Sequence, residues 1–137
     1  MCAAGYSGTP LAKKLGIKEG SSIMVLNAPG NYRVLFDDFP DNVSFVRGNK
    51  VKADLVHYFV TGHNKLVKDI FTLKNAIVQN GCIWISWPKK SSGVPTDISE
   101  DVIRKIAIQH GLVDIKVCAV NETWSGLKLV IPVKDRK

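Results

Sequence analysis

Three predicted strand ends carry the side chains that could hold or transform a ligand. They are the segments 27–31, 61–64 and 87–93. The carboxyl ends of parallel strands meet at one edge of a sheet, and ligands of open α/β sheets bind beyond that edge. We therefore expect the three segments to share one rim, and we predict the binding site there.

The last of these segments has the best composition for holding an anion. Lys89 and Lys90 supply positive charge, and Ser91 and Ser92 supply hydroxyl donors. Gly93 lets the backbone approach a ligand closely. A phosphate, a carboxylate or a nucleic-acid backbone would suit such a loop. A solvated surface loop has the same composition, so that alternative stays open.

The other candidate binding residues are those that the rim and the last predicted hairpin would bring beside this loop. Trp87 and Trp124 could frame a pocket wall, and packing of a sheet edge is the alternative role for both. The predicted binding set is Asn27, Gly30, His63, Trp87, Lys89, Lys90, Ser91, Ser92, Gly93, Trp124 and Lys128.

The sequence lacks the usual motifs of nucleotide enzymes and hydrolases. Segment 27–31 has one glycine and one proline, whereas a dinucleotide loop needs G-x-G-x-x-G and free backbone N–H groups. No phosphate loop and no G-x-S-x-G elbow occurs. No spacing of His, Cys, Asp or Glu suggests a metal site. We predict no cofactor and no metal, and we assign no catalytic residue.

The histidines and cysteines have mostly structural interpretations. His57 falls in an apolar strand, where a core histidine with hydrogen-bond partners is expected. His63 falls on the rim and is the better acid–base candidate. Cys82 and Cys118 fall in apolar runs and are expected to be free thiols that pack as small hydrophobic groups.

The elements that must position these residues alternate between strands and helices. Alternation of this kind predicts right-handed crossovers and a parallel sheet. The last two strands are joined by a connection so short that they must form an antiparallel hairpin. We therefore predict a single three-layer α/β domain over residues 1–137. Strands are expected at 23–26, 43–46, 54–60, 82–87, 114–120 and 127–133, and helices at 10–15, 32–38, 65–79 and 100–110.

Composition narrows the class of protein and of partner. The chain has 137 residues, a hydrophobic fraction of 45% and a formal net charge of +7. That length fits one domain, and the charge favours anionic partners, nucleic acid included. No apolar run is long enough for a signal peptide or a membrane span, so we expect a cytoplasmic protein that does not bind membranes. The hairpin edge leaves a homodimer open.

Three sequence motifs resemble those of a family of small bacterial proteins catalogued as a domain of unknown function. They are residues 5–16, residues 86–93 with Thr96 and Asp97, and residues 117–128. The resemblance spans nearly the whole chain and implies no activity. The strand order also resembles a truncated Rossmann-type methyltransferase, which implies that fold. The glycine-rich loop of such enzymes is replaced here by 27–30, and Arg47 stands where an acidic residue is expected.

These observations lead to three hypotheses. The leading one is a non-catalytic or regulatory binding module that holds a small anionic ligand or a protein partner at the rim, through segment 87–93 and the hairpin near Trp124. The second is a methyltransferase-like enzyme with a degenerate cofactor loop and His63 or Tyr6 as the acid–base residue. The third is nucleic-acid binding through the overall positive charge.

Overall fold

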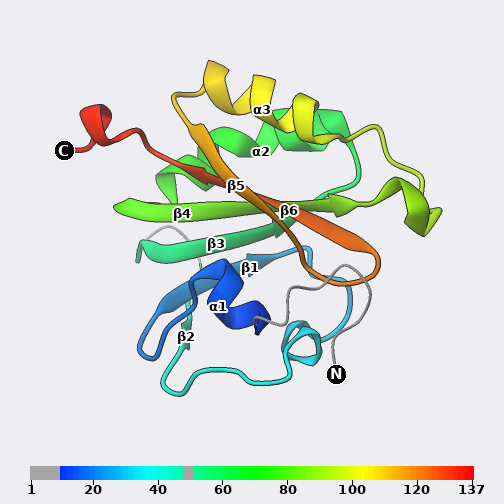
Figure 1. Ribbon diagram of the computed structural model, residues 1–137. Coiled ribbons are helices and arrows are strands. Elements are labelled where there is room, and N and C mark those ends of the chain that lie inside the picture. Colours follow the sequence, from blue (N-terminus) through cyan, green and yellow to red (C-terminus); the bar gives the residue numbers. More distant parts are fainter. Residues whose placement is uncertain (1–9, 48–50) are drawn as a thin grey trace.

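The computed structural model describes residues 10–47 and 51–137, and six strands of this described chain form one sheet (Figure 1). The strand order is β2-β1-β3-β4-β6-β5. The first four strands are mutually parallel, and β6 runs antiparallel to both of its neighbours. The strands are β1 (Ser22–Leu26), β2 (Ser44–Phe45), β3 (Ala53–Phe59), β4 (Ile77–Pro88), β5 (Val113–Ala119) and β6 (Trp124–Val130).

Helical segments cover both faces of the sheet. The helices α2 (His63–Asn75) and α3 (Glu100–Gln109) lie together on one face, above the sheet in Figure 1. The short helix α1 (Leu11–Leu15) and the 3-10 turn η1 (Tyr32–Leu35) lie on the other. Two further 3-10 turns are η2 (Lys90–Ser92) and η3 (Val133–Asp135). The predicted α/β class, with a mostly parallel sheet and a closing antiparallel hairpin, is confirmed.

The core consists of two hydrophobic layers separated by the sheet. One layer packs α2 and α3 against alternate residues of β3, β4 and β6, with Ile70, Ile85 and Leu129 fully buried. The other packs α1 and η1 against the opposite side chains, among them Trp84. The Trp84 indole donates to the carbonyl oxygen of Leu15 at 2.8 Å and so fixes α1 to β4.

Local capping signals account for three of the helix boundaries. The Ser99 hydroxyl accepts from the Val102 N–H and caps α3, whose first turn is acidic. Gly16 adopts φ 88°, a left-handed conformation that ends α1. Asn31 caps η1 by accepting from the Arg33 N–H.

Two predictions about helices were wrong. The predicted helix 65–79 ends at Asn75, and residues 77–81 begin β4 instead. The neighbouring strand sets this change, since the Ala53 N–H donates to Ala76 O at 2.7 Å and Ile77 pairs with Ala53. The predicted helix 32–38 is the shorter 3-10 turn η1, in which Tyr32 is buried and Val34 is 78% exposed.

The outer face of α2 is partly apolar. The apolar side chains of Val67 and Phe71 on α2 are exposed. Within residues 10–47 and 51–137, no helix has the length and apolar character needed to cross a bilayer.

Candidate functional site

The register of the parallel strands brings the three predicted rim segments to one edge. Leu26 pairs with Tyr58, and Phe59 pairs with Ser86, so β1, β3 and β4 end side by side. The segments that contain Asn27, His63 and Lys89 therefore leave the sheet at the same end. The three segments therefore form one rim, and the groups on it determine whether it suits an anion.

Acidic groups of the chain already occupy the helix N-termini at this rim. The Asp97 carboxylate accepts from the backbone N–H of His63, the first residue of α2, at 2.7 Å. The first turn of α3 carries Glu100 and Asp101. The partial positive charge of a helix N-terminus attracts anions, and here it is already matched by side chains. An external anion gains little from either helix.

The loop 87–93 is partly closed on itself. The Ser92 hydroxyl donates to Lys89 O at 2.6 Å and accepts from Val94 N–H at 3.2 Å. Gly93 has φ 78° and caps η2, while Lys90 and Ser91 are exposed. The loop therefore uses one hydroxyl for its own turn and presents the rest to solvent.

The remaining predicted rim residues do not converge on one pocket. Trp87 belongs to the layer beneath α2 and α3, whereas Trp124 packs in the opposite layer with its ring 5.2 Å from that of Phe59. The two tryptophans lie on opposite faces of the sheet and do not form one wall. Asn27 and Gly30 are exposed residues with positive φ in the turn after β1.

A buried hydrogen-bonded network surrounds His57. The Tyr32 hydroxyl lies 2.7 Å from Nδ1, and the Ser86 hydroxyl lies 2.6 Å from Nε2. Burial lowers the pKa of His57 to about 3 and raises that of Tyr32. The expectation of a core histidine with partners is confirmed. Because His57 and Ser86 are both 0% exposed, this serine–histidine–tyrosine arrangement is closed to a substrate.

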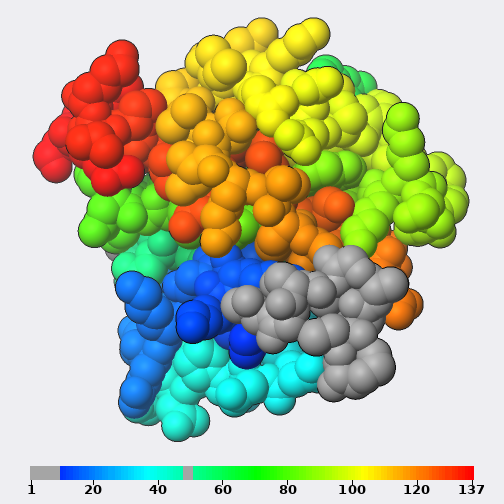
Figure 2. All heavy atoms as spheres, in the orientation of Figure 1, coloured from blue at the N-terminus to red at the C-terminus, as the bar shows by residue number. Residues whose placement is uncertain are grey.

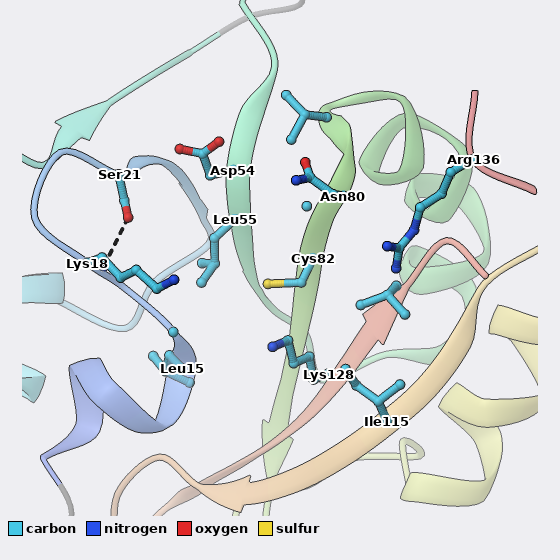
Figure 3. Close-up of a pocket in the computed structure, with 14 residues that line it drawn as sticks. Leu15, Lys18, Ser21, Asp54, Leu55, Asn80, Cys82, Ile115, Lys128 and Arg136 are labelled. Atoms are coloured by element: carbon cyan, nitrogen blue, oxygen red, sulfur yellow. Dashed lines mark hydrogen bonds between the residues drawn. The ribbon is translucent and has the colours of Figure 1, made fainter. Parts of the chain in front are cut away.

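A basic cavity lies at the other end of the sheet, where β3 and β4 begin (Figure 3). Its volume is about 510 Å³, within the range of small-molecule sites. Three separate parts of the chain form it: the turn between α1 and β1, the strands, and the segment after η3. Figure 2 shows the C-terminal residues (red), the start of β4 (green) and the segment near α1 (blue) along one side of the molecule.

Three cationic side chains point into this cavity from different walls. Lys18 comes from the turn after α1, Lys128 from β6, and Arg136 from the C-terminal segment (Figure 3). The Arg136 Nε donates to Ile131 O at 2.9 Å, which fixes the guanidinium. Within the part of the chain that the structure describes, the ammonium groups of Lys18 and Lys128 make no hydrogen bond or ion pair.

Polar groups with acceptor character occupy another wall of the cavity. Asp54 and Asn80 lie at the starts of β3 and β4 (Figure 3). One Asp54 oxygen, Oδ2, accepts from the Ser22 N–H at 2.9 Å. Asp54 is the one acidic residue among the described lining residues, against three cations. The cavity therefore carries a net positive charge.

Cys82 also lines the cavity and is protonated at neutral pH. The side chain is 8% exposed, and burial raises its pKa to about 11. A thiol in that state is a poor nucleophile. Cys82 therefore contributes bulk and polarisability to the wall, as expected for a core cysteine. Cys118 is likewise a free thiol, and burial raises its pKa as well.

Sequence reasoning identified one of the polar residues of this cavity and placed it at the wrong end. Lys128 was predicted to act with the rim loop, but it pairs with Trp84 in mid-strand and lines the cavity instead. Lys18, Asp54, Asn80 and Arg136 were missed. No spacing links positions so far apart in the chain, and no local motif marks them.

One of the two predicted acid–base residues, His63, lies in the part of the chain that the structure describes. In residues 10–47 and 51–137, no group of three His, Cys, Asp or Glu side chains could hold a metal ion. His63 is half-buried at the start of α2, with its Nδ1 3.4 Å from Asn64 Oδ1. Tyr6, the other predicted acid–base residue, and residues 5–9 of the first motif lie outside the described residues.

Solved structures with a similar fold are methyltransferases and related proteins. A SAM-dependent methyltransferase from Aquifex aeolicus matches with a TM-score of 0.64 and 16% identity, over 88% of this chain and 87% of that one. The DhpI–SAH complex matches with a TM-score of 0.61 and 10% identity, over 87% and 80%. The Methanococcus jannaschii fibrillarin pre-rRNA processing protein matches with a TM-score of 0.55 and 15% identity, over 83% and 67%. At such identities the likeness shows the fold alone.

Sequence comparison identifies the family. No protein with curated annotation matches the chain. The family described as "Protein of unknown function (DUF3052)" matches residues 47–133, which is more than half of the 137 residues. This match covers α2, α3 and the strands from β3 to β6, and therefore most of the walls of the basic cavity. The chain belongs to the DUF3052 family.

Proposed function

We propose that this protein is a non-catalytic binding module for a small anionic ligand, and that the ligand occupies the basic cavity at the start of β3 and β4. The observation that carries the proposal is the convergence of Lys18, Lys128 and Arg136 on a cavity of about 510 Å³. The class of function is the one that the sequence favoured. The site lies at the opposite end of the sheet from the predicted rim.

Electrostatics supports this placement. Like charges held near one another repel, and the repulsion is stronger where protein replaces water. Lys128 and Arg136 are half-buried, so their charges are only partly screened. A bound anion would offset the repulsion and provide acceptors for the ammonium and guanidinium groups. At the rim, by contrast, Asp97 already accepts from the first N–H of α2, and Glu100 is already ion-paired with Arg104.

The groups at the cavity favour binding over catalysis. Its thiol is protonated at neutral pH, and the buried His57 network does not line it. Nucleophilic catalysis needs an accessible nucleophile beside a base. The described lining residues offer no such pair. The cavity can hold and orient an anion without transforming it.

A methyltransferase-like activity is the second candidate, and the observation that favours it is the fold. It would place the cofactor at the rim, near segment 27–31. That segment has a proline in place of backbone donors, and Arg47 follows the second strand where an acidic residue would contact ribose. A role in nucleic-acid binding rests on the net charge of +7 alone.

Amide chemical shifts of the labelled protein distinguish the two ends of the sheet. Inorganic phosphate is titrated into the protein while the backbone amides of Gly16 and Gly81 at the cavity, and of Gly62 and Gly93 at the rim, are followed. We expect saturable shifts at Gly16 and Gly81, with the rim glycines unmoved. Largest shifts at Gly93 would move the site to the rim, and no saturable shift anywhere would reject anion binding.

A matched pair of variants tests the role of the cavity charge. Lys128→Gln removes one of the converging cations, and Lys105→Gln removes an exposed cation from α3. We expect the first to weaken phosphate binding by about tenfold, the loss of one charge-assisted hydrogen bond. The second should leave it within about twofold, because solvent screens a distant surface charge. Equal effects would mean that only overall charge matters.

A further inference from the structure

The polar groups around the basic cavity are arranged unevenly. Asp54 and Asn80 lie along one side, where β3 and β4 begin, and the three cations point in from the other walls (Figure 3). A ligand that fills the cavity therefore meets positive charge over part of its surface. It meets a carboxylate and an amide over another part. The ligand must carry two kinds of polar group.

The cationic side suits a doubly charged group with several acceptor oxygens. Arg136 uses its Nε on Ile131 O, which leaves Nη1 and Nη2 as paired donors for two oxygens of one anion. Lys18 and Lys128 supply two further charged donors. A phosphomonoester offers a charge near −2 and three terminal oxygens. A single carboxylate has two oxygens and one charge, and it would leave the cations under-compensated.

The acceptor side selects against a second anion. An ionised carboxylate is an acceptor only, and Asp54 already receives one backbone N–H at Oδ2. Its other oxygen suits a neutral donor such as a hydroxyl group. The Asn80 amide both donates and accepts, which also fits hydroxyl groups. A ligand with a second negative group in this position would be repelled by Asp54.

The apolar part of the wall is aliphatic. Leu15, Leu55 and Val130 line the cavity, and no aromatic side chain is among its lining residues in the described parts of the chain. Nucleobases are commonly held by stacking on aromatic rings. The C–H groups of a saturated carbon skeleton can pack on leucine and valine without such a platform. The wall therefore favours a saturated ligand over a nucleotide.

From these features we infer that the ligand is a phosphorylated polyol, that is, a sugar phosphate or a close relative. Its phosphate lies among Lys18, Lys128 and Arg136, and its hydroxyl groups donate to Asp54 and bond with Asn80. This inference rests on the proposed function, because it names the ligand class for the same cavity. It adds a recognition role for Asp54 that anion binding by itself does not require.

Calorimetric titration of the full chain tests the ligand class. The probes are inorganic phosphate, glycerol 3-phosphate, ribose 5-phosphate, fructose 6-phosphate, adenosine monophosphate, citrate and unphosphorylated fructose. We expect at least one of the three polyol phosphates to bind about tenfold or more tightly than phosphate, the gain from added hydrogen bonds. The same probe should bind more tightly than adenosine monophosphate or citrate, and fructose should give no measurable binding.

Two substitutions separate the hydroxyl contacts from the phosphate contacts. Asp54→Asn keeps an acceptor for the Ser22 N–H but loses the charge, so polyol phosphate affinity should fall about tenfold. Its affinity for inorganic phosphate should be unchanged or slightly higher, because a nearby negative charge is removed. The matched control Glu122→Gln removes an exposed carboxylate from the β5–β6 turn and should change neither.

The outcomes distinguish failure of this inference from failure of the proposed function. If phosphate binds as tightly as every polyol phosphate, or if Asp54→Asn affects both probes alike, the ligand class is wrong while anion binding in the cavity stands. Tighter binding of adenosine monophosphate or citrate would have the same meaning. If no probe binds, or if Lys128→Gln has no effect on binding, both proposals are overturned.

Discussion

At the scale of single residues, each buried polar side chain that the structure describes has a hydrogen-bond partner. His57 is fully buried between the hydroxyl groups of Tyr32 and Ser86, and no buried side-chain polar atom in the described chain lacks a partner. A neutral imidazole has one donor and one acceptor nitrogen, so two hydroxyl neighbours satisfy it completely. Removing either hydroxyl leaves one imidazole nitrogen of His57 buried without a hydrogen-bond partner.

The first prediction concerns Ser86. Ser86→Ala should lower the free energy of unfolding by about 1–3 kcal/mol, the cost of a buried unsatisfied polar group. Ser91→Ala, at an exposed position in the loop after β4, should change it by less than about 0.5 kcal/mol. Urea denaturation of both variants measures the difference. Equal stability of the two would show that the network contributes nothing.

The second prediction concerns the pH dependence of stability. Burial holds the pKa of folded His57 at about 3, whereas an unfolded histidine titrates near 6.5. Between these values the unfolded chain binds more protons, so the free energy of unfolding falls as the pH is lowered. Above pH 6.5 the buried, neutral His57 makes its full contribution to the free energy of unfolding. From pH 7 to pH 5 we expect a loss of about 2 kcal/mol from this residue.

Two histidine variants isolate that effect. His57→Gln removes the titrating group and should flatten the change in stability between pH 7 and 5 by about the same amount. His110→Gln removes the half-buried histidine at the C-cap of α3 and should keep the steep dependence of the wild type. Urea midpoints at several pH values provide the measurement. An unchanged slope in His57→Gln would contradict the assignment.

At the scale of elements, the start of β3 and β4 determines the shape of the cavity. The register between the two strands shifts from Ala53–Ile77 to Leu55–Cys82, so residues 78–81 bulge out of the ladder. Gly81 lies in this bulge and lines the cavity. A Cβ at Gly81 would be 2.8 Å from the carbonyl oxygen of Asp54, a backbone atom that cannot move alone.

The third prediction follows from that close approach. Gly81→Ala should destabilise the fold by about 1–3 kcal/mol, because the two strands must separate to admit a methyl group. It should also weaken phosphate binding, since the same shift moves Asp54 and the cavity wall. Gly62→Ala is the matched control: it has nothing within 4 Å of the added carbon and should cost less than about 1 kcal/mol. Denaturation and phosphate titration of both variants measure the effects.

At the scale of the whole molecule, the two ends of the sheet carry different sets of charged groups. The rim carries both signs of charge: Lys89 and Lys90 lie there, as do Asp97 and the carboxylates Glu100 and Asp101, which are ion-paired with Arg104. The opposite end carries Lys18, Lys128 and Arg136 around one cavity. A cofactor at the rim and an anion in the cavity are therefore distinguishable proposals, and thermal stability reports on both.

The fourth prediction compares their ligands. At about 100 times its dissociation constant, a ligand specific for the folded state adds about 2.7 kcal/mol. For a chain of 137 residues this raises Tm by about 10 °C. We expect a polyol phosphate to do so and S-adenosylmethionine to leave Tm unchanged. A shift with S-adenosylmethionine alone would favour a methyltransferase-like activity at the rim.

Much of the fold followed from local sequence patterns. The six residues 55–60 suit a strand covered on both faces, which supports the strand predicted over 54–60, and all six are buried. The helix predicted over 100–110 is α3, which begins at Glu100 after the N-cap Ser99, and a short connection predicted the antiparallel hairpin. Each of these signals acts between residues that are close in the chain, so the sequence alone was sufficient for them.

The tertiary structure decided the features that depend on distant partners. Ile77 and Val78 continue the apolar pattern of the preceding helix, but pairing of Ile77 with Ala53 starts β4 there. The cavity depends on such pairing even more strongly. Lys128 reaches it because β6 inserts between β4 and β5, and Arg136 reaches it because the chain then returns past the start of β4. Periodicity and capping describe only neighbours in sequence, whereas strand order and register determine which charges meet in space.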